Sequence, residues 1–312
     1  MDKREQKHFL LASALGLVAF LCSALAYLRV PDQNLTNADW MSTLADSTPL
    51  SRISLPGTHD SGATVPLYDF AGKCQDASIA EQLNYGARFL DIRLKATRDS
   101  LSLYHGFIDQ QQNFDSVLST CYLFLQKHPT ETIMMSVQEE QESSACTKGF
   151  ETLLQETIAL KPESWYTANV IPTLSSVRSR IVLLSRYEDS TIGLDCNPAS
   201  WQVNATFDLN NGVAFHIQDT YKIDDNAVKW SEAQNCFDFS AALSGNDVFV
   251  INFMSGYLDK PIGPLNLAVA APTAQYVNPL AKTRMSSHLF TGIVLFDFLT
   301  ADLADAVIGA NL

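Results

Sequence analysis

The chain has 312 residues, of which 46% are hydrophobic and 18% are charged, and its formal net charge is −13. This length supports one large domain or two small ones, and the composition excludes an intrinsically disordered chain. The surplus of acidic residues, 34 against 21 basic ones, argues against nucleic acid as a partner, because phosphate backbones bind to basic surfaces. Any contact with an anionic membrane should therefore be local and transient.

The N-terminus has the pattern of a targeting segment. Three basic residues precede an apolar run over residues 9–28, which contains an A-x-A-like cleavage site near its end. The run fits a cleaved signal peptide and, at about twenty residues, it fits an uncleaved signal anchor equally well. Both alternatives predict a protein that is secreted or held at the cell surface by residues 1–28. Residues 29–312 are then expected to form a single domain.

Five cysteines lie beyond that segment: Cys74, Cys121, Cys146, Cys196 and Cys236. For an exported chain, two disulfides and one free thiol are expected, with the pairing left open. No cysteine–histidine cluster has zinc-ligand spacing, so no structural zinc is expected. Two Asn-x-Thr triplets, at Asn34 and Asn204, fit an exported glycoprotein.

Short β-rich runs alternate with longer amphipathic stretches along the chain. In order, eight runs span residues 52–55, 87–94, 101–106, 132–138, 180–187, 213–219, 248–253 and 292–298. Several are almost continuous Val, Ile, Leu and Phe, as in strands that are covered on both faces. Helices are predicted between them over 113–128, 147–160 and 226–243.

This alternation predicts an α/β fold, a single-domain (β/α)8 barrel of the TIM type. The second and third runs leave no room for a helix between them, so an irregular, distorted barrel fits better than a regular one. A doubly wound open sheet is the alternative, although no glycine-rich phosphate loop follows any of the runs.

Nearly every run ends in an ionisable or hydrogen-bonding side chain. The ends are His59-Asp60, Arg93, His105, Gln138-Glu139-Glu140, Arg186, Asp219, Asn252 and Asp297. In a barrel, these ends converge on one mouth, where such enzymes keep their chemistry. A single one of them is well explained by a salt bridge or a helix cap, but the whole set predicts an active site. At the first end, Pro56-Gly57 is expected to terminate the strand and to aim His59 into the mouth.

Two histidines, several carboxylates and an arginine, without a metal-ligand pattern, suit acid–base cleavage of a phosphate ester. One imidazole can take the proton of an attacking hydroxyl, while the other protonates the leaving oxygen. A guanidinium can hold the charge that develops on the phosphoryl oxygens. No Gly-x-Ser-x-Gly motif is present, which disfavours a serine hydrolase.

Several blocks resemble the X domain of phosphatidylinositol-specific phospholipase C of the bacterial type. They follow in order from Trp40 to the C-terminus, and the most specific are Pro-Gly-Thr-His-Asp-Ser-Gly around His59 and Leu-Asp-Ile-Arg ending at Arg93. The resemblance implies a distorted barrel that cleaves phosphatidylinositol by attack of the inositol 2-hydroxyl. The products would be diacylglycerol and inositol 1,2-cyclic phosphate.

The resemblance also implies a role for each matching position. His59 matches the general base, which Asp297 orients. His105 matches the general acid, which Asp60 assists. Arg93 matches the group that stabilises the transition state where calcium-dependent members use a metal, so no metal and no other cofactor are expected. Inositol contacts are expected from Glu140, Arg186, Asp219, Tyr221 and, more loosely, Trp201.

Two departures from the family pattern affect head-group preference more than catalysis. Gln138-Glu139 stands where the family has a basic residue, and Tyr104 stands where a second histidine is frequent. The stretch 256–272, punctuated by proline and glycine, is expected either to enter a membrane interface or to pack on the barrel.

The expected partner is phosphatidylinositol in a membrane, contacted transiently by a monomer. The sequence leaves open whether glycosylphosphatidylinositol anchors are cleaved as well. One alternative is a metal-dependent phosphodiesterase for glycerophosphodiesters or sphingolipids on a related barrel. A second is a catalytically silent barrel that binds inositol lipids or glycans.

Overall fold

The computed structural model describes residues 37–66, 71–245, 247–262 and 265–311, with no account of the side chains of 259–268. These residues belong to one compact unit, Asn37–Leu312. Residues 1–28, expected to be a signal peptide or signal anchor, lie outside the described residues, and so does the triplet at Asn34.

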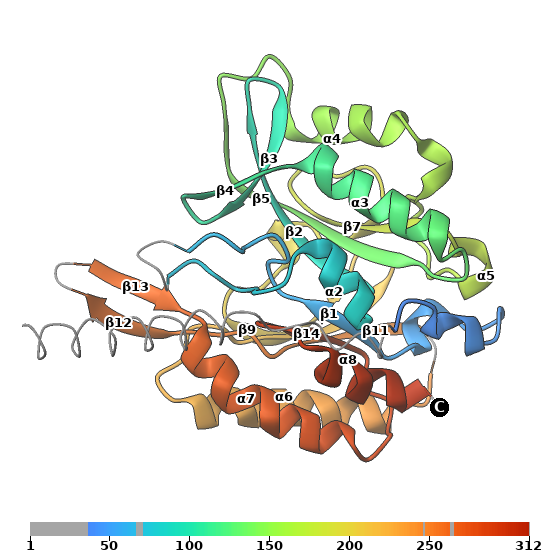
Figure 1. The fold of residues 1–312 in the computed structure, drawn as a ribbon, viewed down its shortest axis with the longest axis vertical. Helices are drawn as coiled ribbons and strands as arrows, with labels where there is room; N and C mark the ends of the chain where they lie inside the picture. The colour runs from blue at the N-terminus through green and yellow to red at the C-terminus, as the bar shows by residue number, and fades with distance from the viewer. Residues whose placement is uncertain (1–36, 67–70, 246, 263–264, 312) are drawn as a thin grey trace, which may run out of the picture. The chain divides into compact units, whose positions relative to one another are not determined.

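A curled and mostly parallel sheet forms the centre of this unit (Figure 1). Its strands are β1 (Leu55–Thr58), β2 (Phe89–Thr97), β5 (Ile133–Ser144), β6 (Trp165–Tyr166), β7 (Ile181–Arg186), β8 (Leu194–Asp195), β9 (Ala205–Asn210), β10 (Ala214–Asp219), β11 (Val248–Phe253) and β14 (Ile293–Phe296). The order is β6-β7-β5-β2-β1-β14-β11-β10-β9, with β8 also paired to β7. Pairing along this order is parallel except between β10 and β9.

Two antiparallel hairpins extend from the sheet. They consist of β3 (Ser100–His105) with β4 (Ile108–Asn113) and of β12 (Leu258–Ile262) with β13 (Leu265–Val269). The third predicted run is therefore β3, which pairs antiparallel with β2 instead of forming a barrel strand. The other seven runs supply barrel strands, and the predicted irregular α/β barrel is confirmed.

Helices cover the outside of the sheet. They are α2 (Ile79–Tyr85), α3 (Phe114–Lys127), α4 (Phe150–Ala159), α5 (Leu174–Val177), α6 (Asn226–Ala242), α7 (Ala271–Met285) and α8 (Ala301–Ile308). Short 3-10 turns occupy Trp40–Thr43, Leu50–Arg52, Pro162–Ser164, Pro198–Ser200 and Gly309–Asn311. The three predicted helices are confirmed as α3, α4 and α6. The side chain of Asn113 caps α3 by accepting from the Ser116 amide at 2.8 Å.

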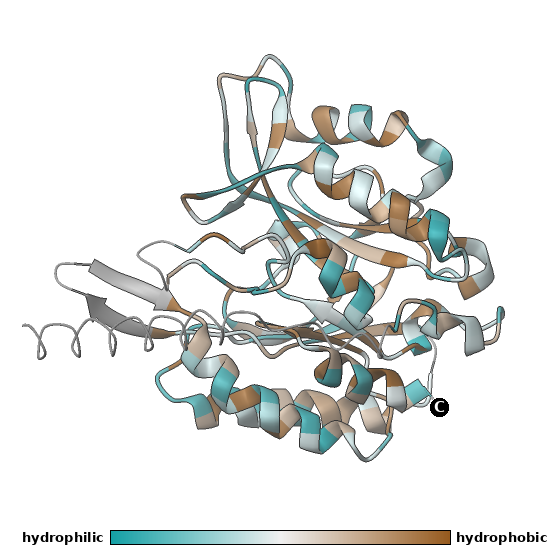
Figure 2. Ribbon diagram, viewed as in Figure 1, coloured by the Kyte–Doolittle hydropathy of each residue, from teal (hydrophilic) through white to brown (hydrophobic). Residues whose placement is uncertain are grey.

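Apolar side chains fill the space inside the sheet and between the sheet and its helices. Figure 2 shows the hydrophobic residues along the strands and on one side of the surrounding helices. One cluster packs β2, β5 and β7 against α3 and α4, and another packs β14 against α7 and α8. The third, which includes Phe215, Phe249 and Phe253, fills the barrel. This packing holds the strand ends that carry the polar residues.

Pro56 and Gly57 do not end the first strand, contrary to expectation. Both lie within β1, which pairs with β14 on one side and β2 on the other. A Cβ at Gly57 would come within 2.6 Å of the Leu295 side chain and 2.8 Å of the Phe89 Cβ, so only glycine allows this close approach. The strand ends at Thr58, and the His59 amide then donates to the Phe296 carbonyl at 3.0 Å.

The sheet is not closed by strand pairing among the described residues, because β9 ends it on one side and β6 and β8 end it on the other. Asn169 connects these two edges. Its Nδ2 donates to the Asn211 carbonyl at 2.7 Å, and its Oδ1 accepts from the Asp195 amide at 3.2 Å. Side chains therefore complete the barrel where the backbone ladder stops.

The expected disulfides are wrong. All five cysteines within the described residues are free, and four of them are buried. Cys121, for example, lies in the core, and burial raises its pKa to about 12. The glycan expected at Asn204 also gains no support, since its Nδ2 donates to the Lys222 carbonyl at 3.2 Å.

The expected location also requires correction. Within the part of the chain that the structure describes, no helix combines the length and the apolarity needed to cross a membrane. The prediction of a secreted or membrane-anchored protein rested mainly on residues 1–28, which lie outside that part. The structure thus gives this prediction no support.

Candidate active site

A pocket of about 630 Å³ opens at the C-terminal ends of the parallel strands. All but one of the predicted site residues line it: His59, Arg93, His105, Glu140, Arg186, Trp201, Asp219, Tyr221 and Asp297. The exception, Asp60, is buried behind His105 and bonded to it. Asn252, which also ends a predicted run, is not at the pocket, because its amide donates to the Ala233 carbonyl of α6.

His59 and Asp297 meet because their strands run parallel and in register. Thr58 of β1 pairs with Phe296 of β14, so the next residue of each strand lies at the same edge of the sheet. The Nδ1 atom of His59 lies 2.8 Å from Oδ1 of Asp297, and its Nε2 lies 2.9 Å from NH2 of Arg93. Arginine can only donate, so Nδ1 carries the imidazole proton and Nε2 carries the lone pair.

A buried glutamine, which the sequence analysis missed, fixes this pair. Nε2 of Gln75 donates to the carbonyls of His59 and Phe296, each at 2.8 Å, and its Oε1 accepts from the Leu299 amide. Gln75 is fully buried, and it ties the end of β1 to the end of β14. It lies outside any helix or strand, so no periodic pattern in the sequence marks it.

His105 and Asp60 form the second imidazole–carboxylate pair. His105 is the last residue of β3, and its Nδ1 bonds to Oδ2 of Asp60. Asp60 has a left-handed φ of 38°, and its amide donates to Oδ2 of Asp91 at 3.1 Å. Burial alone would lower the pKa of His105, but the hydrogen bond and charge of Asp60 outweigh it and raise the pKa. His105 therefore retains its proton more strongly than an ordinary histidine.

Arg93 lies between the two pairs, held by a carboxylate that the sequence analysis did not select. Asp91 and Arg93 are two residues apart on β2 and so share a face, and the Arg93 Nε donates to Asp91 Oδ2 at 3.1 Å. Burial would raise the pKa of Asp91, but Arg93 and then Arg186 outweigh it and lower the pKa to about 2. Asp91 is therefore ionised near neutral pH, and it orients the Arg93 guanidinium. The sequence contained a signal for this contact, because Asp91 and Arg93 are two residues apart in the Leu-Asp-Ile-Arg block and therefore share a strand face.

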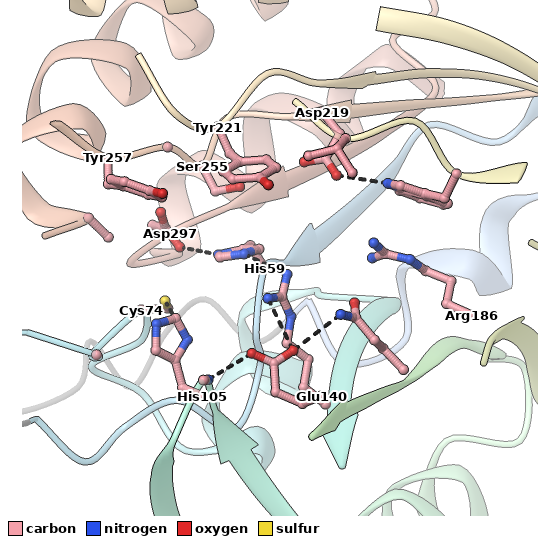
Figure 3. A pocket seen from close by; sticks show the side chains of 18 of the residues that line it. His59, Cys74, His105, Glu140, Arg186, Asp219, Tyr221, Ser255, Tyr257 and Asp297 are labelled. Carbon is pink, nitrogen blue, oxygen red and sulfur yellow. Dashed lines mark hydrogen bonds and ion pairs between the residues drawn. The ribbon is translucent and has the colours of Figure 1, made fainter. Parts of the chain in front are cut away.

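The residues expected to bind inositol line two sides of the pocket (Figure 3). The guanidinium carbon of Arg186 lies 3.6 Å from the centre of the Trp201 ring, and Trp201 Nε1 donates to Asp219 Oδ2 at 2.9 Å. The Tyr221 amide donates to Oδ1 of Asn204 at 2.8 Å. Across the pocket, Glu140 Oε1 accepts from the Gly106 amide at 2.7 Å. Together these residues offer cationic, anionic and aromatic groups to a ligand.

Other residues line the pocket without having been predicted as site residues, among them Cys74, Ser255 and Tyr257. Ser255 is 1% exposed, and its hydroxyl has no hydrogen-bond partner within the described residues. No sequence signal identified Cys74 or Ser255, because Cys74 precedes α2 in an irregular segment and Ser255 follows the end of β11. Tyr257 belongs to the stretch 256–272, which was expected to enter a membrane interface or to pack on the barrel, not to line the pocket.

Known proteins are similar to this chain in sequence and in fold. The family profile described as "Phosphatidylinositol-specific phospholipase C, X domain" matches residues 49–187. A 1-phosphatidylinositol phosphodiesterase of Staphylococcus aureus is 34% identical over 278 residues, which cover 83% of this chain and 88% of the relative. The chain belongs to the phosphatidylinositol-specific phospholipase C X-domain family. The resemblance seen in the sequence is thereby confirmed.

Further relatives in this family support the same fold. A 1-phosphatidylinositol phosphodiesterase of Listeria monocytogenes is 38% identical over 163 residues, which cover 49% of this chain and 50% of the relative. A structure of the S. aureus enzyme has a TM-score of 0.78 at 28% identity and covers 89% of this chain and 98% of that one. The L. monocytogenes phospholipase C structure has a TM-score of 0.69 at 27% identity, with coverages of 89% and 99%.

Proposed function

We propose that this protein is a phosphatidylinositol-specific phospholipase C that releases diacylglycerol and inositol 1,2-cyclic phosphate. One observation carries the proposal. An imidazole whose Nε2 offers a lone pair, at present to Arg93, and a second imidazole that favours protonation lie in one pocket, on either side of Arg93. This is the arrangement that a concerted transfer of two protons requires.

The proposed reaction uses each of these groups once. Nε2 of His59 takes the proton of the inositol 2-hydroxyl as that oxygen attacks phosphorus. The bond from phosphorus to the diacylglycerol oxygen breaks, and His105 gives its proton to that oxygen. Asp297 stabilises the imidazolium that forms at His59, because it accepts from Nδ1. Arg93 stabilises the charge on the phosphoryl oxygens.

This assignment predicts activity without a metal ion. The Arg93 guanidinium already supplies the positive charge beside His59, at 2.9 Å from Nε2. Cleavage of phosphatidylinositol should therefore persist in excess chelator. Activity that is lost in chelator and restored by calcium would favour the metal-dependent alternative.

The residues expected to bind inositol support recognition of an unphosphorylated ring. Asp219 and Glu140 can accept from ring hydroxyls, while Arg186 can donate. Glu139 and Glu140 both line the pocket, and their charge disfavours additional phosphates on the ring. We therefore expect phosphatidylinositol to be cleaved faster than its phosphorylated forms. Whether glycosylphosphatidylinositol anchors are cleaved as well can be tested by adding a protein with such an anchor to the same assay.

Two exposed apolar residues at the pocket mouth support contact with a membrane. Phe107 is 73% exposed and follows the pocket residue Gly106, while Val203 is 79% exposed and itself lines the pocket. The stretch 256–272, expected to contact the interface, contains the β12–β13 hairpin, which projects from the barrel in Figure 1. Most of the hairpin side chains lie outside the described set, so that part stays a prediction. One chain supplies every group of the pocket, and we expect a monomer.

The test is product analysis with purified protein and phosphatidylinositol vesicles. Phosphorus NMR should detect inositol 1,2-cyclic phosphate, and His59→Ala should form it at least about 10²-fold more slowly. His128→Ala is the matched control, because His128 ends α3 outside the pocket and bonds to Asp39. Binding to vesicles without any cleavage by the wild type would favour the catalytically silent barrel.

A further inference from the structure

The Cys74 thiol lies between the two imidazole–carboxylate pairs. Its Sγ is 3.9 Å from Nδ1 of His105, and Figure 3 shows the sulfur between His105 and Asp297. Ligand atoms of Cys74, His59 and Asp297 lie within 4.8 Å of one another, and the same holds for Cys74, Asp60 and His105. Cys74 is 2% exposed and lines the pocket, so its thiol is reached from the pocket alone. The proposed reaction does not use it.

An unused carboxylate oxygen lies in the same place. Asp297 is 1% exposed, and its Oδ2 has no hydrogen-bond partner of normal geometry among the described residues. Burial, followed by the charges of Asp297 and Asp60 and by a weak thiol contact with Asp297, raises the pKa of the Cys74 thiol. A thiol is a weak donor, so this buried oxygen remains costly unless a cation or a stronger donor reaches it.

We propose that Cys74, His59 and Asp297 form an inhibitory binding site for a thiophilic divalent cation such as Zn²⁺. Thiolate, imidazole nitrogen and carboxylate oxygen are zinc ligands, with bonds of about 2.0–2.3 Å. Ligands bound at those lengths lie roughly 3–4 Å apart, so atoms within 4.8 Å need only a small approach. Water completes the tetrahedron. Hard ions such as Ca²⁺ or Mg²⁺ prefer oxygen ligands and are not expected here.

Binding of the ion removes the general base. The thiol releases its proton to solvent, and the metal takes the place of the proton on Nδ1 of His59. That proton moves to Nε2, so the imidazole stays neutral but no longer offers a lone pair to the substrate. The same event removes Asp297 from its hydrogen bond with Nδ1 and leaves NH2 of Arg93 facing an N–H group. The inhibition therefore combines loss of the base with loss of its orienting carboxylate.

The test begins with binding, which does not depend on the proposed function. Co²⁺ is titrated into the full chain, and the thiolate-to-cobalt charge-transfer absorption is recorded. The wild type and the control Cys146→Ala should show this band at one equivalent, with Zn²⁺ displacing it. Cys74→Ala should lose the band while keeping its thermal unfolding midpoint. A band that persists in Cys74→Ala, or none in the wild type, overturns the proposal.

Two further measurements test the ligand set and the inhibition. Asp297→Asn should weaken cobalt binding tenfold or more, and unchanged binding would overturn the assignment of Asp297. Zn²⁺ should inhibit phosphatidylinositol cleavage reversibly, and Cys74→Ala should need at least tenfold more Zn²⁺ for half inhibition. Equal sensitivity of the two proteins overturns the proposal. A wild type that binds cobalt but cleaves no lipid would count against the proposed function alone.

Discussion

The catalytic half of the pocket and its inositol-binding half are supported by different parts of the barrel. His59, Arg93 and Asp297 extend from β1, β2 and β14, which are neighbours in the parallel sheet. Arg186 and Asp219 come from β7 and β10, on either side of the gap in the ladder, and Trp201 spans that gap from a segment without regular structure. Strand register positions the first half, whereas side-chain contacts position the second. Changes in the first half should lower kcat, and changes in the second should mainly raise KM.

The largest effect is expected from removing either histidine. His59→Ala and His105→Ala should each lower kcat about 10²–10⁴-fold on phosphatidylinositol, the usual contribution of one proton transfer. The two variants can be distinguished with a substrate analogue in which a leaving group of low pKa, such as a nitrophenol, replaces the diacylglycerol. That substrate needs no general acid, so His105→Ala should recover most of its activity while His59→Ala should not. Equal recovery of both variants would contradict the separate roles of base and acid.

The next effect is expected at Arg93. Arg93→Lys keeps the charge but loses the planar fork that reaches Asp91 and His59 at once. We expect kcat to fall about 10²–10³-fold, as when one charge-stabilising donor is removed from an active site. Steady-state kinetics on vesicles measures the loss, and Arg52→Lys, outside the pocket, is the matched control. An Arg93→Lys enzyme close to wild type would show that charge alone suffices.

A smaller effect, visible mainly in the pH profile, is expected from Asp60→Asn. Without the Asp60 charge, burial and Arg93 remain to lower the pKa of His105. The basic limb of kcat/KM, which reports the loss of the acid's proton, should then move to lower pH. The acidic limb should stay in place, because the substitution leaves the His59–Asp297 pair intact. A shift of both limbs, or of neither, would exclude His105 as the acid.

The same variant tests a linkage to stability. The folded-state pKa of His105 is raised above its ordinary value, so its pair with Asp60 stabilises the fold fully below about pH 6.5. This stabilisation is lost as the pH rises through the raised folded value. The difference in unfolding free energy between wild type and Asp60→Asn should therefore shrink from pH 6 to alkaline pH. Denaturant titrations at several pH values measure it.

The same contrast explains what could be predicted from the sequence. Strand ends on adjacent parallel strands converge by geometry, so His59, Arg93 and Asp297 were correctly placed at one mouth. His105 was also selected, although its strand proved to belong to an antiparallel hairpin. Cys74 and Gln75 were missed because they lie in an irregular segment, where position depends on packing that no local pattern records.

The disulfide prediction failed for a related reason. It was drawn from an expected compartment and from a count of cysteines, neither of which contains distances. In the fold, Cys121, Cys196 and Cys236 are separately buried beside apolar residues or strand ends, and none of the five forms a disulfide. Connectivity depends on the approach of two Cα atoms to within about 7 Å, which only the tertiary structure sets.

The smallest catalytic effect is expected from Trp201→Phe, which tests the inositol-binding half. Phenylalanine keeps an aromatic face for Arg186 but loses the Nε1 donor to Asp219. We expect KM for a soluble inositol phosphodiester to rise about three- to tenfold, as for the net loss of one ordinary hydrogen bond, with kcat nearly unchanged. Trp165→Phe, whose Nε1 donates to Tyr122 far from the pocket, controls for general damage. A fall in kcat at constant KM would show that the gap-spanning segment positions the catalytic groups as well, and that the two halves do not act separately.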